Sequence, residues 1–144
     1  PTIQWLKPSL TMSQGDYHSQ NEPCLYGWKE GGGRVRVKDR KQTTIWKCDR
    51  TSEAKIHPTM KPVELCQRAI ENSSDVNGIV LDLFGGSGST LIACEKTARD
   101  CRMMELDPKY IDVIIKRWQE FTGKQATHAD TGETFEELSN VRLP

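Results

Sequence analysis

A glycine-rich stretch with hydroxyl and acidic side chains has the composition of a turn that binds a small molecule. Residues 81–90 read LDLFGGSGST and end a short apolar run. Glycines let a ligand approach the backbone, and in α/β sheets such turns lie past the carboxyl end of a strand, where ligands bind. A carboxylate that can accept from an ammonium group, followed by hydroxyls and helix N-terminal amides, suits an amino acid moiety. The candidate binding residues in this stretch are Asp82, Gly85, Gly86, Ser87, Gly88, Ser89 and Thr90.

An acidic residue at the end of the next predicted strand extends this site toward a nucleoside. Glu105 stands 23 residues after Asp82, where a carboxylate can accept both hydroxyls of a ribose. The dinucleotide pattern Gly-x-Gly-x-x-Gly, read from Gly86, would need a glycine where Leu91 stands, and no Gly-Lys-Ser/Thr occurs. A nucleoside without phosphates is therefore favoured over NAD and ATP. The alternative is a turn that merely connects a strand to a helix.

Hydrophobic spacing predicts the elements that would position these residues. The run 78–84 is short and apolar, as in a fully buried strand. Asp107-Pro108 and Gly123 supply the signals that begin and end a helix. The alternation of strands and helices predicts an α/β fold with a parallel βαβ core and a right-handed crossover. The predicted elements are a helix that opens at Pro62 and covers VELCQRAIENS, strand 78–84, helix 90–98, strand 101–106 and helix 107–123.

The N-terminal third carries weaker structural signals. Residues 2–7 alternate apolar and polar positions as in a half-buried strand, which Pro8 is expected to stop. Residues 23–28 are a second candidate strand, followed by a glycine run that can form a tight turn. The next segments, residues 34–37 and 43–46, could form either a basic β-hairpin or an irregular loop.

Three motifs, in a fixed order, make residues 57–118 similar to the β-class DNA amino-methyltransferases, which modify adenine N6 or cytosine N4. The earlier stretch 5–28 also resembles members of this class from phages and prophages. The three motifs are His57-Pro58-Thr59-Met60-Lys61-Pro62, then Asp82-Leu83-Phe84-Gly85-Gly86-Ser87-Gly88, and then Glu105-Leu106-Asp107-Pro108-Lys109-Tyr110.

The resemblance implies part of a Rossmann-like methyltransferase fold, S-adenosylmethionine as cofactor and double-stranded DNA as partner. It implies that Lys61 and Asp82 face the methionine portion of the cofactor. It also implies that Phe84 and the glycines line the pocket and that Glu105 binds the ribose. Physically, Lys61 is a cation that could meet the methionine carboxylate. The alternative is an exposed lysine at the start of a helix.

The catalytic motif of the class is absent from the sequence. Methyl transfer to an exocyclic amine needs a polar acceptor at the nitrogen and an aromatic face for the flipped base, and the class supplies both with Asp/Asn/Ser-Pro-Pro-Tyr/Phe/Trp. The segment Asp107-Pro108-Lys109-Tyr110 differs from it and serves as a helix cap. We therefore predict no catalytic residue in this chain. We expect a missing N-terminal catalytic segment or a second chain, an inactive chain on its own, and exposed apolar sheet edges.

Two other functions stay open at this stage. One is a catalytically inactive cofactor-binding or DNA-binding remnant, or one part of a split enzyme. The other is a methyltransferase of RNA or of a small molecule, which the segment 57–62 disfavours. Adenine N6 is favoured over cytosine N4 only by the similarity to phage members.

A basic segment from Lys29 to Arg50 lies where the class places its target-recognition region. Its cations could contact phosphates while Trp46 or Trp28 stacks on a base; the alternative is a solvated loop. The candidate DNA-binding residues are Arg34, Arg36, Lys38, Arg40 and Lys41.

These patterns predict three regions. Residues 1–56 would hold the final strands of a catalytic half and the basic segment, and residues 57–127 would bind the cofactor. Residues 128–144 are acidic and form either a mobile tail or a short helix capped by Thr134 with Glu137.

Composition limits the remaining classes of function. The chain has 20 basic and 20 acidic residues, so its total charge favours no polyanionic partner. Five cysteines without a Cys-x-x-Cys pair, and three scattered histidines, indicate a reduced, cytoplasmic protein without a metal site. No apolar run approaches the length of a membrane span and no signal peptide is recognisable, which predicts a protein without a membrane partner.

Overall fold

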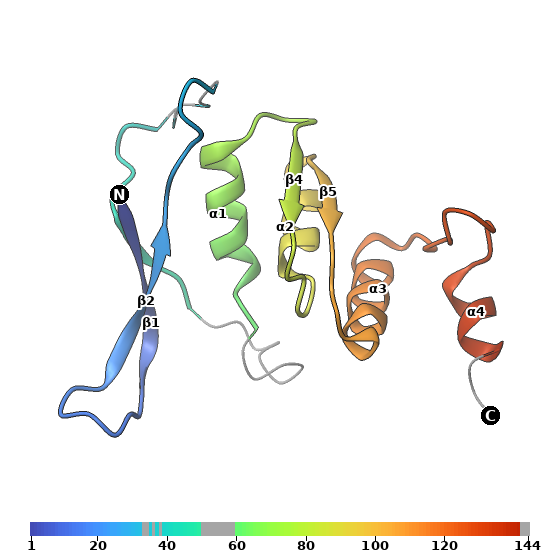
Figure 1. Ribbon diagram of the computed structural model, residues 1–144, viewed down its shortest axis with the longest axis horizontal. Helices are drawn as coiled ribbons and strands as arrows, with labels where there is room; N and C mark the ends of the chain where they lie inside the picture. Colours follow the sequence, from blue (N-terminus) through green and yellow to red (C-terminus); the bar gives the residue numbers. More distant parts are fainter. Residues whose placement is uncertain (33–34, 36, 38, 50–59, 142–144) are drawn as a thin grey trace.

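The computed structural model of the chain describes residues 1–32, 35, 37, 39–49 and 60–141. Its elements form two small sheets, with a helix between them (Figure 1). In chain order they are β1 (Thr2–Thr11), β2 (Ser19–Leu25), β3 (Ile45–Lys47), α1 (Val63–Ser73), β4 (Ile79–Asp82), α2 (Ser89–Thr97), β5 (Asp100–Met103), α3 (Pro108–Thr122) and α4 (Phe135–Val141).

The N-terminal sheet has the order β2-β1-β3. β1 pairs antiparallel with β2 and parallel with β3, and Trp5 lies opposite Trp46. The prediction that Pro8 stops the first strand is wrong, because β1 continues to Thr11. Proline is tolerated there because the β1–β2 register is irregular between Leu6 and Thr11, so no regular ladder hydrogen bond is lost.

The second predicted strand differs from the structure, and the segment left open between a basic hairpin and an irregular loop is only partly described. β2 covers Ser19–Leu25 instead of 23–28. Of the basic segment, residues 33, 34, 36, 38 and 50 lie outside the described part. Residues 35 and 37 are not in a strand, and residues 45–47 form β3, which pairs with β1.

The predicted parallel βαβ unit is present as β4-α2-β5. Ile79 pairs with Asp100 and Asp82 with Met103, in parallel register. The core forms where α1 and α2 cover one face of this unit, and its buried members are Val63, Ile70, Ile92, Ala93 and Cys94, with Val80, Cys101 and Trp118 packed against them. This arrangement confirms the α/β fold class.

Both helix caps predicted near the C-terminus are observed. The side chain of Asp107 accepts a hydrogen bond from the Lys109 backbone nitrogen at 2.9 Å, and Gly123 ends α3 with a left-handed backbone at φ 69°. Thr134 and Glu137 form a reciprocal pair at the start of α4. The Thr134 nitrogen donates to Glu137 Oε2 at 2.8 Å, and the Glu137 nitrogen donates to Thr134 Oγ1 at 3.3 Å. The short helix is therefore formed.

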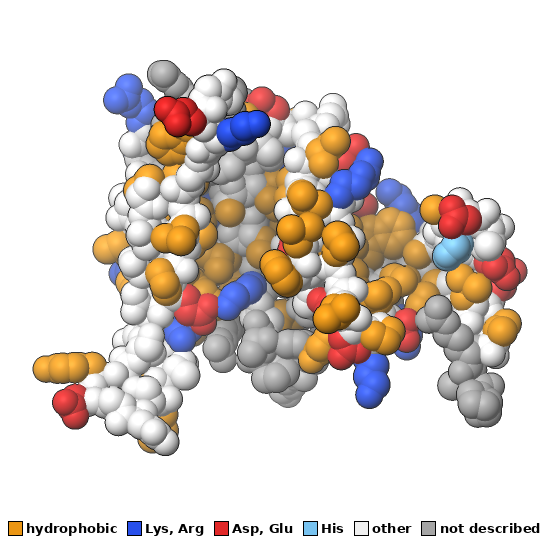
Figure 2. All heavy atoms as spheres, viewed as in Figure 1, with side chains coloured by type: hydrophobic (Ala, Val, Ile, Leu, Met, Phe, Trp, Pro, Cys, Tyr) orange, Lys and Arg blue, Asp and Glu red, His pale blue; other side chains and the backbone are white. Residues whose placement is uncertain are grey.

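The prediction that strand 78–84 is fully buried is wrong. Burial alternates along β4, and Ile79 and Leu81 are 67% and 64% exposed. The helices cover only the face that carries Val80, so within the described ranges the opposite face is open. Apolar side chains gather on this side of the molecule (Figure 2). The large exposed apolar residues of β4, β5 and their ends are Ile79, Leu81, Leu83, Phe84, Met104 and Leu106.

All five cysteines are free thiols. Within the described residues no helix has the length and apolar character to cross a membrane. The same part of the chain holds no cluster of histidine, cysteine and acidic side chains that could bind a metal ion.

Candidate cofactor-binding site

Most of the predicted cofactor residues line a single cavity. It has a volume of about 210 Å³ and lies between the turn after β4 and the start of α1. Of the ten predicted residues, only Gly88 and Glu105 are not among its lining. The lining residues are Met60, Lys61, Cys66, Asp82, Phe84, Gly85, Gly86, Ser87, Ser89 and Thr90.

The glycine turn can form only with glycine at particular positions. Gly86 and Gly88 have φ values of 55° and 81°, the left-handed region that disfavours other residues. A Cβ added to Gly85 would lie 2.7 Å from the Met103 sulfur, and one added to Gly88 would lie 3.2 Å from Ile114 Cγ2. Gly85 therefore brings the turn against β5, and Gly88 lets α3 pack behind it.

Glu105 joins the two strand ends beside this cavity. Its Oε2 atom accepts a hydrogen bond from the Gly86 backbone nitrogen at 2.7 Å. Its Oε1 atom accepts from the Leu106 and Asp107 backbone nitrogens at 2.9 and 3.0 Å. The backbone thus fixes the orientation of this carboxylate at the mouth of the glycine turn.

Asp82 is oriented at the other end of the turn, where its Oδ1 atom accepts from the Phe84 backbone nitrogen at 3.0 Å. The Phe84 ring itself is 87% exposed at the edge of the cavity. A carboxylate and an exposed aromatic ring are thereby presented together by a three-residue segment.

Buried serines connect the floor of the cavity to neighbouring elements. Ser89 Oγ donates to the Lys61 carbonyl oxygen at 2.7 Å, which fixes the backbone just before α1. Arg117 of α3 donates to the Ser87 carbonyl oxygen at 3.0 Å and to Ser89 Oγ at 3.3 Å. Sequence reasoning missed Arg117, since no motif marks it and only its position on α3 brings it here.

Met60 and Cys66 are two further lining residues that sequence reasoning did not assign to the site. Cys66 appeared only as part of the apolar pattern of a helix. Burial is the main cause that raises the pKa of the Cys66 thiol, so this wall of the cavity is neutral at physiological pH. An apolar wall beside polar groups at the turn suits a ligand with a thioether-like chain and a charged end.

Lys61 lines the cavity and lies directly before Pro62, the N-cap of α1. Its ammonium forms an ion pair with Glu22 Oε2 of β2 and lies 5.3 Å from the centre of the Trp5 ring. The side chain is 49% exposed. Lys61 is thus exposed at the start of a helix, as in the alternative, and it also has two partners in the N-terminal sheet. His57, from the same motif, lies outside the described residues.

The candidate DNA-binding residues are only partly described. Arg34, Arg36 and Lys38 lie outside the described ranges. Arg40 and Lys41 are exposed, and the Lys41 backbone nitrogen donates to Asp39 Oδ1 at 2.9 Å in a turn.

The structure argues against one of the two tryptophans proposed to stack on a base. Trp46 is 5% exposed, its Nε1 donates to the Thr43 carbonyl oxygen at 2.9 Å, and Arg68 lies 4.7 Å from its ring centre. Its ring is therefore occupied inside the protein. Trp28 is 54% exposed and lies 5.9 Å from Tyr26, ring centre to ring centre.

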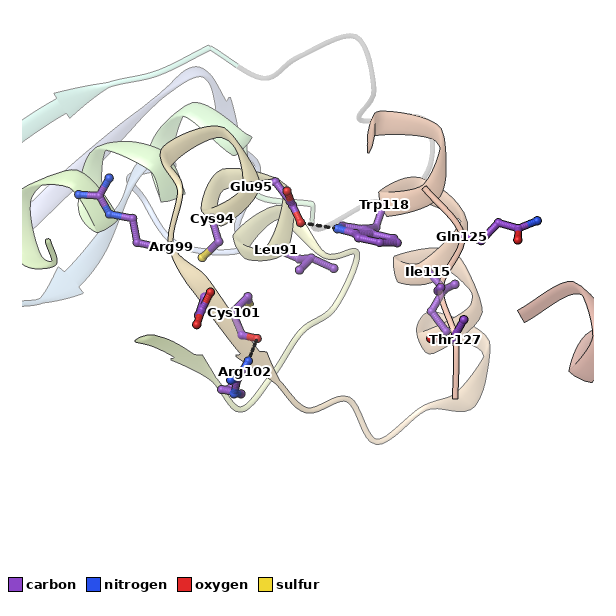
Figure 3. Close-up of a pocket in the computed structure, with 12 residues that line it drawn as sticks. Leu91, Cys94, Glu95, Arg99, Cys101, Arg102, Ile115, Trp118, Gln125 and Thr127 are labelled. Carbon is purple, nitrogen blue, oxygen red and sulfur yellow. Dashed lines mark hydrogen bonds between the residues drawn. The ribbon is translucent and has the colours of Figure 1, made fainter. Parts of the chain in front are cut away.

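A larger hollow of about 490 Å³ lies away from the glycine turn, between α2, β5 and α3 (Figure 3). In it, Trp118 Nε1 donates to Glu95 Oε1 at 2.9 Å across from Leu91. None of the ten predicted cofactor residues lines it. Arg99, at its rim, is held by Ser74 and by the Thr97 carbonyl oxygen. The predicted cofactor residues therefore mark the smaller of these two cavities.

Comparison with known proteins assigns the chain to a family. The family model of the N6_N4 DNA methylases matches residues 3–117. The chain belongs to this family. Type II methyltransferase M.Cfr9I of Citrobacter freundii is 30% identical over 107 residues, which cover 70% of this chain and 34% of that protein. Type II methyltransferase M.HinfI of Haemophilus influenzae is 35% identical over 88 residues, which cover 61% and 21% of the two chains.

Solved structures of DNA methylases share the fold of this N6_N4 family member. The crystal structure of the M1.HpyAVI–SAM complex matches with a TM-score of 0.71 and 29% identity, and covers 82% of this chain and 61% of that one. The PvuII DNA methyltransferase, a cytosine-N4-specific enzyme, matches with a TM-score of 0.64 at 17% identity, which shows a common fold alone. The chain spans about a third or less of the two curated relatives.

Proposed function

We propose that this DNA methylase family member binds S-adenosylmethionine in the cavity at the glycine turn and acts in methyl transfer to an exocyclic amine of DNA. The observation that carries the proposal is that eight of the ten residues predicted for the cofactor line one cavity. A ninth, Glu105, is hydrogen-bonded to the turn. The cavity of about 210 Å³ is smaller than a typical pocket for a whole ligand of this size, so it suits the methionine part.

The charges around the cavity suit the parts of this ligand. Asp82 accepts from the ammonium group and Lys61 donates to the carboxylate. Glu105, beyond the other end of the turn, accepts from the ribose hydroxyls. The sulfonium of the bound cofactor supplies an activated methyl group. The work of these residues is therefore positioning.

The acceptor and its contacts are further parts of the proposal. Double-stranded DNA is the partner, with adenine N6 favoured over cytosine N4, and the basic segment contacts its phosphates through Arg34, Arg36, Lys38, Arg40 and Lys41. Residues 1–56 hold the final strands of the catalytic half and the DNA-binding segment. Residues 57–127 bind the cofactor, and residues 128–144 are an acidic tail. The free thiols suit action in the cytoplasm.

We further propose that the 144 residues alone bind the cofactor without transferring the methyl group. They contain no Pro-Pro-aromatic tetrapeptide to hold a flipped base. The motif would come from a segment or a second chain that pairs with this one. A remnant that has kept cofactor binding and lost catalysis is the alternative, and the same observation favours it.

Calorimetric titration of the chain with S-adenosylmethionine tests the cofactor proposal. We expect micromolar affinity, about −8 kcal/mol, that falls at least tenfold in Glu105→Ala. Glu120→Gln, an exposed change on α3, is the matched control and should bind as the wild type does. A folded wild-type chain that produces no binding heat would overturn the proposal.

Transfer is tested separately, with tritiated cofactor and duplex DNA. The chain alone should label no DNA, and addition of a polypeptide that carries the missing tetrapeptide should restore labelling. Labelling by the chain alone would contradict its proposed inactivity. Binding without labelling in every combination would favour the remnant.

A further inference from the structure

Lys61 is held in place by two residues of the N-terminal sheet. Glu22 lies opposite Trp5 in the β1–β2 ladder. The Glu22 carboxylate binds the Lys61 ammonium, and the Trp5 ring faces the same ammonium at 5.3 Å. A flexible four-carbon side chain is thereby fixed by an ion pair and a cation–π contact. The lysine that borders the cofactor cavity thus depends on a different sheet for its position.

Glu22 lies between two cations. Its Oε1 atom is 3.6 Å from Lys7 Nζ, while its Oε2 atom binds Lys61. Lys7 is only 6% exposed and also donates to Thr11 Oγ1 at 2.7 Å. A buried ammonium needs a counter-ion, so Glu22 is committed to Lys7 whether or not Lys61 is present. The row Lys7, Glu22, Lys61 carries one net positive charge.

Glu22 is ionised at neutral pH. Partial burial acts to raise its pKa, but the hydrogen bonds and charges of Lys61 and Lys7 outweigh burial and lower the pKa below its ordinary value of 4.5. Both lysines therefore face a full negative charge.

The lysine that contributes the surplus positive charge borders the cavity. Lys61 lines both the cavity at the glycine turn and an adjoining apolar pocket of about 320 Å³, which also contains Trp5 and Glu22. An ammonium has three donors, and Glu22 uses one of them. A ligand carboxylate that takes another donor would complete an alternating row of charges without displacing Glu22.

We infer that Glu22 is a positioning residue for the cofactor: through its ion pair it holds the Lys61 ammonium at the cavity wall, where that ammonium receives the ligand carboxylate. The inference rests on the proposed binding of S-adenosylmethionine at this cavity. It adds a residue from β2, outside the glycine turn and outside the three motifs of residues 57–118. It also assigns the N-terminal sheet a part in cofactor binding.

The test compares two probes that differ in the amino acid part. S-adenosylmethionine carries the carboxylate, and 5′-methylthioadenosine has the adenosyl thioether without it. We expect Glu22→Gln to lower the affinity for S-adenosylmethionine about tenfold, as loss of one charge-assisted contact would. The affinity for methylthioadenosine should stay within about twofold of the wild-type value. Lys61→Met should act likewise, and the double variant should bind no more weakly than Lys61→Met, since Glu22 acts through Lys61. Glu71→Gln, an exposed change on α1, is the control.

Other outcomes would overturn the inference. Tighter binding of S-adenosylmethionine by Glu22→Gln would mean that Glu22 competes with the ligand. Equal weakening of both probes would mean general damage, and additive losses in the double variant would mean that Glu22 does not act through Lys61. If Glu22→Gln does not fold, because Lys7 loses its counter-ion, Glu22→Asp keeps that charge while its shorter side chain cannot reach both lysines, and the same split between probes is expected.

The inference and the proposed function fail in different ways. A wild-type chain that binds neither probe would overturn both. Wild-type binding that Lys61→Met leaves unchanged would remove Lys61 from the site. Binding that depends on Lys61 and is unaffected in Glu22→Gln would overturn the inference alone.

Discussion

Gly85 lies so close to Met103 that a Cβ on the glycine would be 2.7 Å from the methionine sulfur. The turn after β4 therefore packs directly on the side chain that ends β5. The same turn is tied to the next segment by the hydrogen bond from Gly86 to Glu105. The site is thus shaped by contact between two strand ends.

Gly85→Ala should destabilise the chain by about 1–3 kcal/mol through overpacking. The added methyl would also meet Ile114 Cδ1 at 3.1 Å, so neither neighbour gives way freely. Urea unfolding followed by circular dichroism measures the change. Gly27→Ala, where nothing lies within 4 Å of the added Cβ, is the matched control. Equal stabilities of the two variants would refute the close packing, and Met103→Ala should relieve part of the loss.

Cysteine alkylation should follow burial. Burial is the main cause that raises the pKa of Cys101 to about 12 and of Cys48 to about 11, so at pH 8 few of these thiols are thiolates. Cys24 is exposed and should react with iodoacetamide first. Mass spectrometry of peptides after timed quenching gives the order in which the cysteines are alkylated. In the urea-unfolded chain the cysteines should react at similar rates. Early labelling of Cys101 in the folded chain would contradict the structure.

The start of α4 should depend on pH. Hydrogen bonds from the Thr134 backbone and hydroxyl lower the pKa of Glu137 below its ordinary value of 4.5. A carboxyl with a lowered folded-state pKa stabilises the folded form above the unfolded-state value, and this contribution is lost as the pH falls from about 4.5 through the folded-state pKa. Amide chemical shifts of 135–141 should therefore move toward coil values below that pH. Glu137→Gln should lack this transition, and an identical transition in it would exclude Glu137 as the cause.

The Trp46–Arg68 contact should be measurable. The guanidinium carbon lies 4.7 Å from the ring centre of a buried tryptophan, and Arg68 Nε also donates to Gln42 Oε1 at 2.9 Å. Arg68→Ala should lower the free energy of unfolding by about 0.5–2 kcal/mol and change the tryptophan fluorescence. Arg102→Ala, an exposed arginine on β5, is the control. A loss no greater than that of the control would show that the stacking contributes nothing to stability.

Local signals were sufficient for the order of helices and strands and for the helix caps in the C-terminal half. The βαβ unit, the caps at Asp107 and Gly123, and the pair Thr134–Glu137 all involve residues near one another in sequence, whose side chains determine backbone geometry directly. The grouping of the turn residues around one cavity follows from the same local order.

Contacts distant in sequence were not predictable. The pairing of Lys61 with Glu22 spans 39 residues, and that of Arg117 with Ser87 spans 30. Neither leaves a spacing pattern. The exposure of β4 was missed for a related reason: an apolar run predicts burial on both faces, but it does not show which neighbouring element covers each face. The continuation of β1 through Pro8 depended on an irregular register that only the paired strand reveals.

The open face of β4 has a consequence for handling the protein. Ile79 and Leu81 form an exposed apolar surface on β4. Within the described ranges, no other strand pairs with the outer edge of β4. Such surfaces recruit amphiphiles and neighbouring molecules. We expect hydrophobic dyes and mild detergents to bind there, and light scattering to rise with concentration faster in buffer than in detergent.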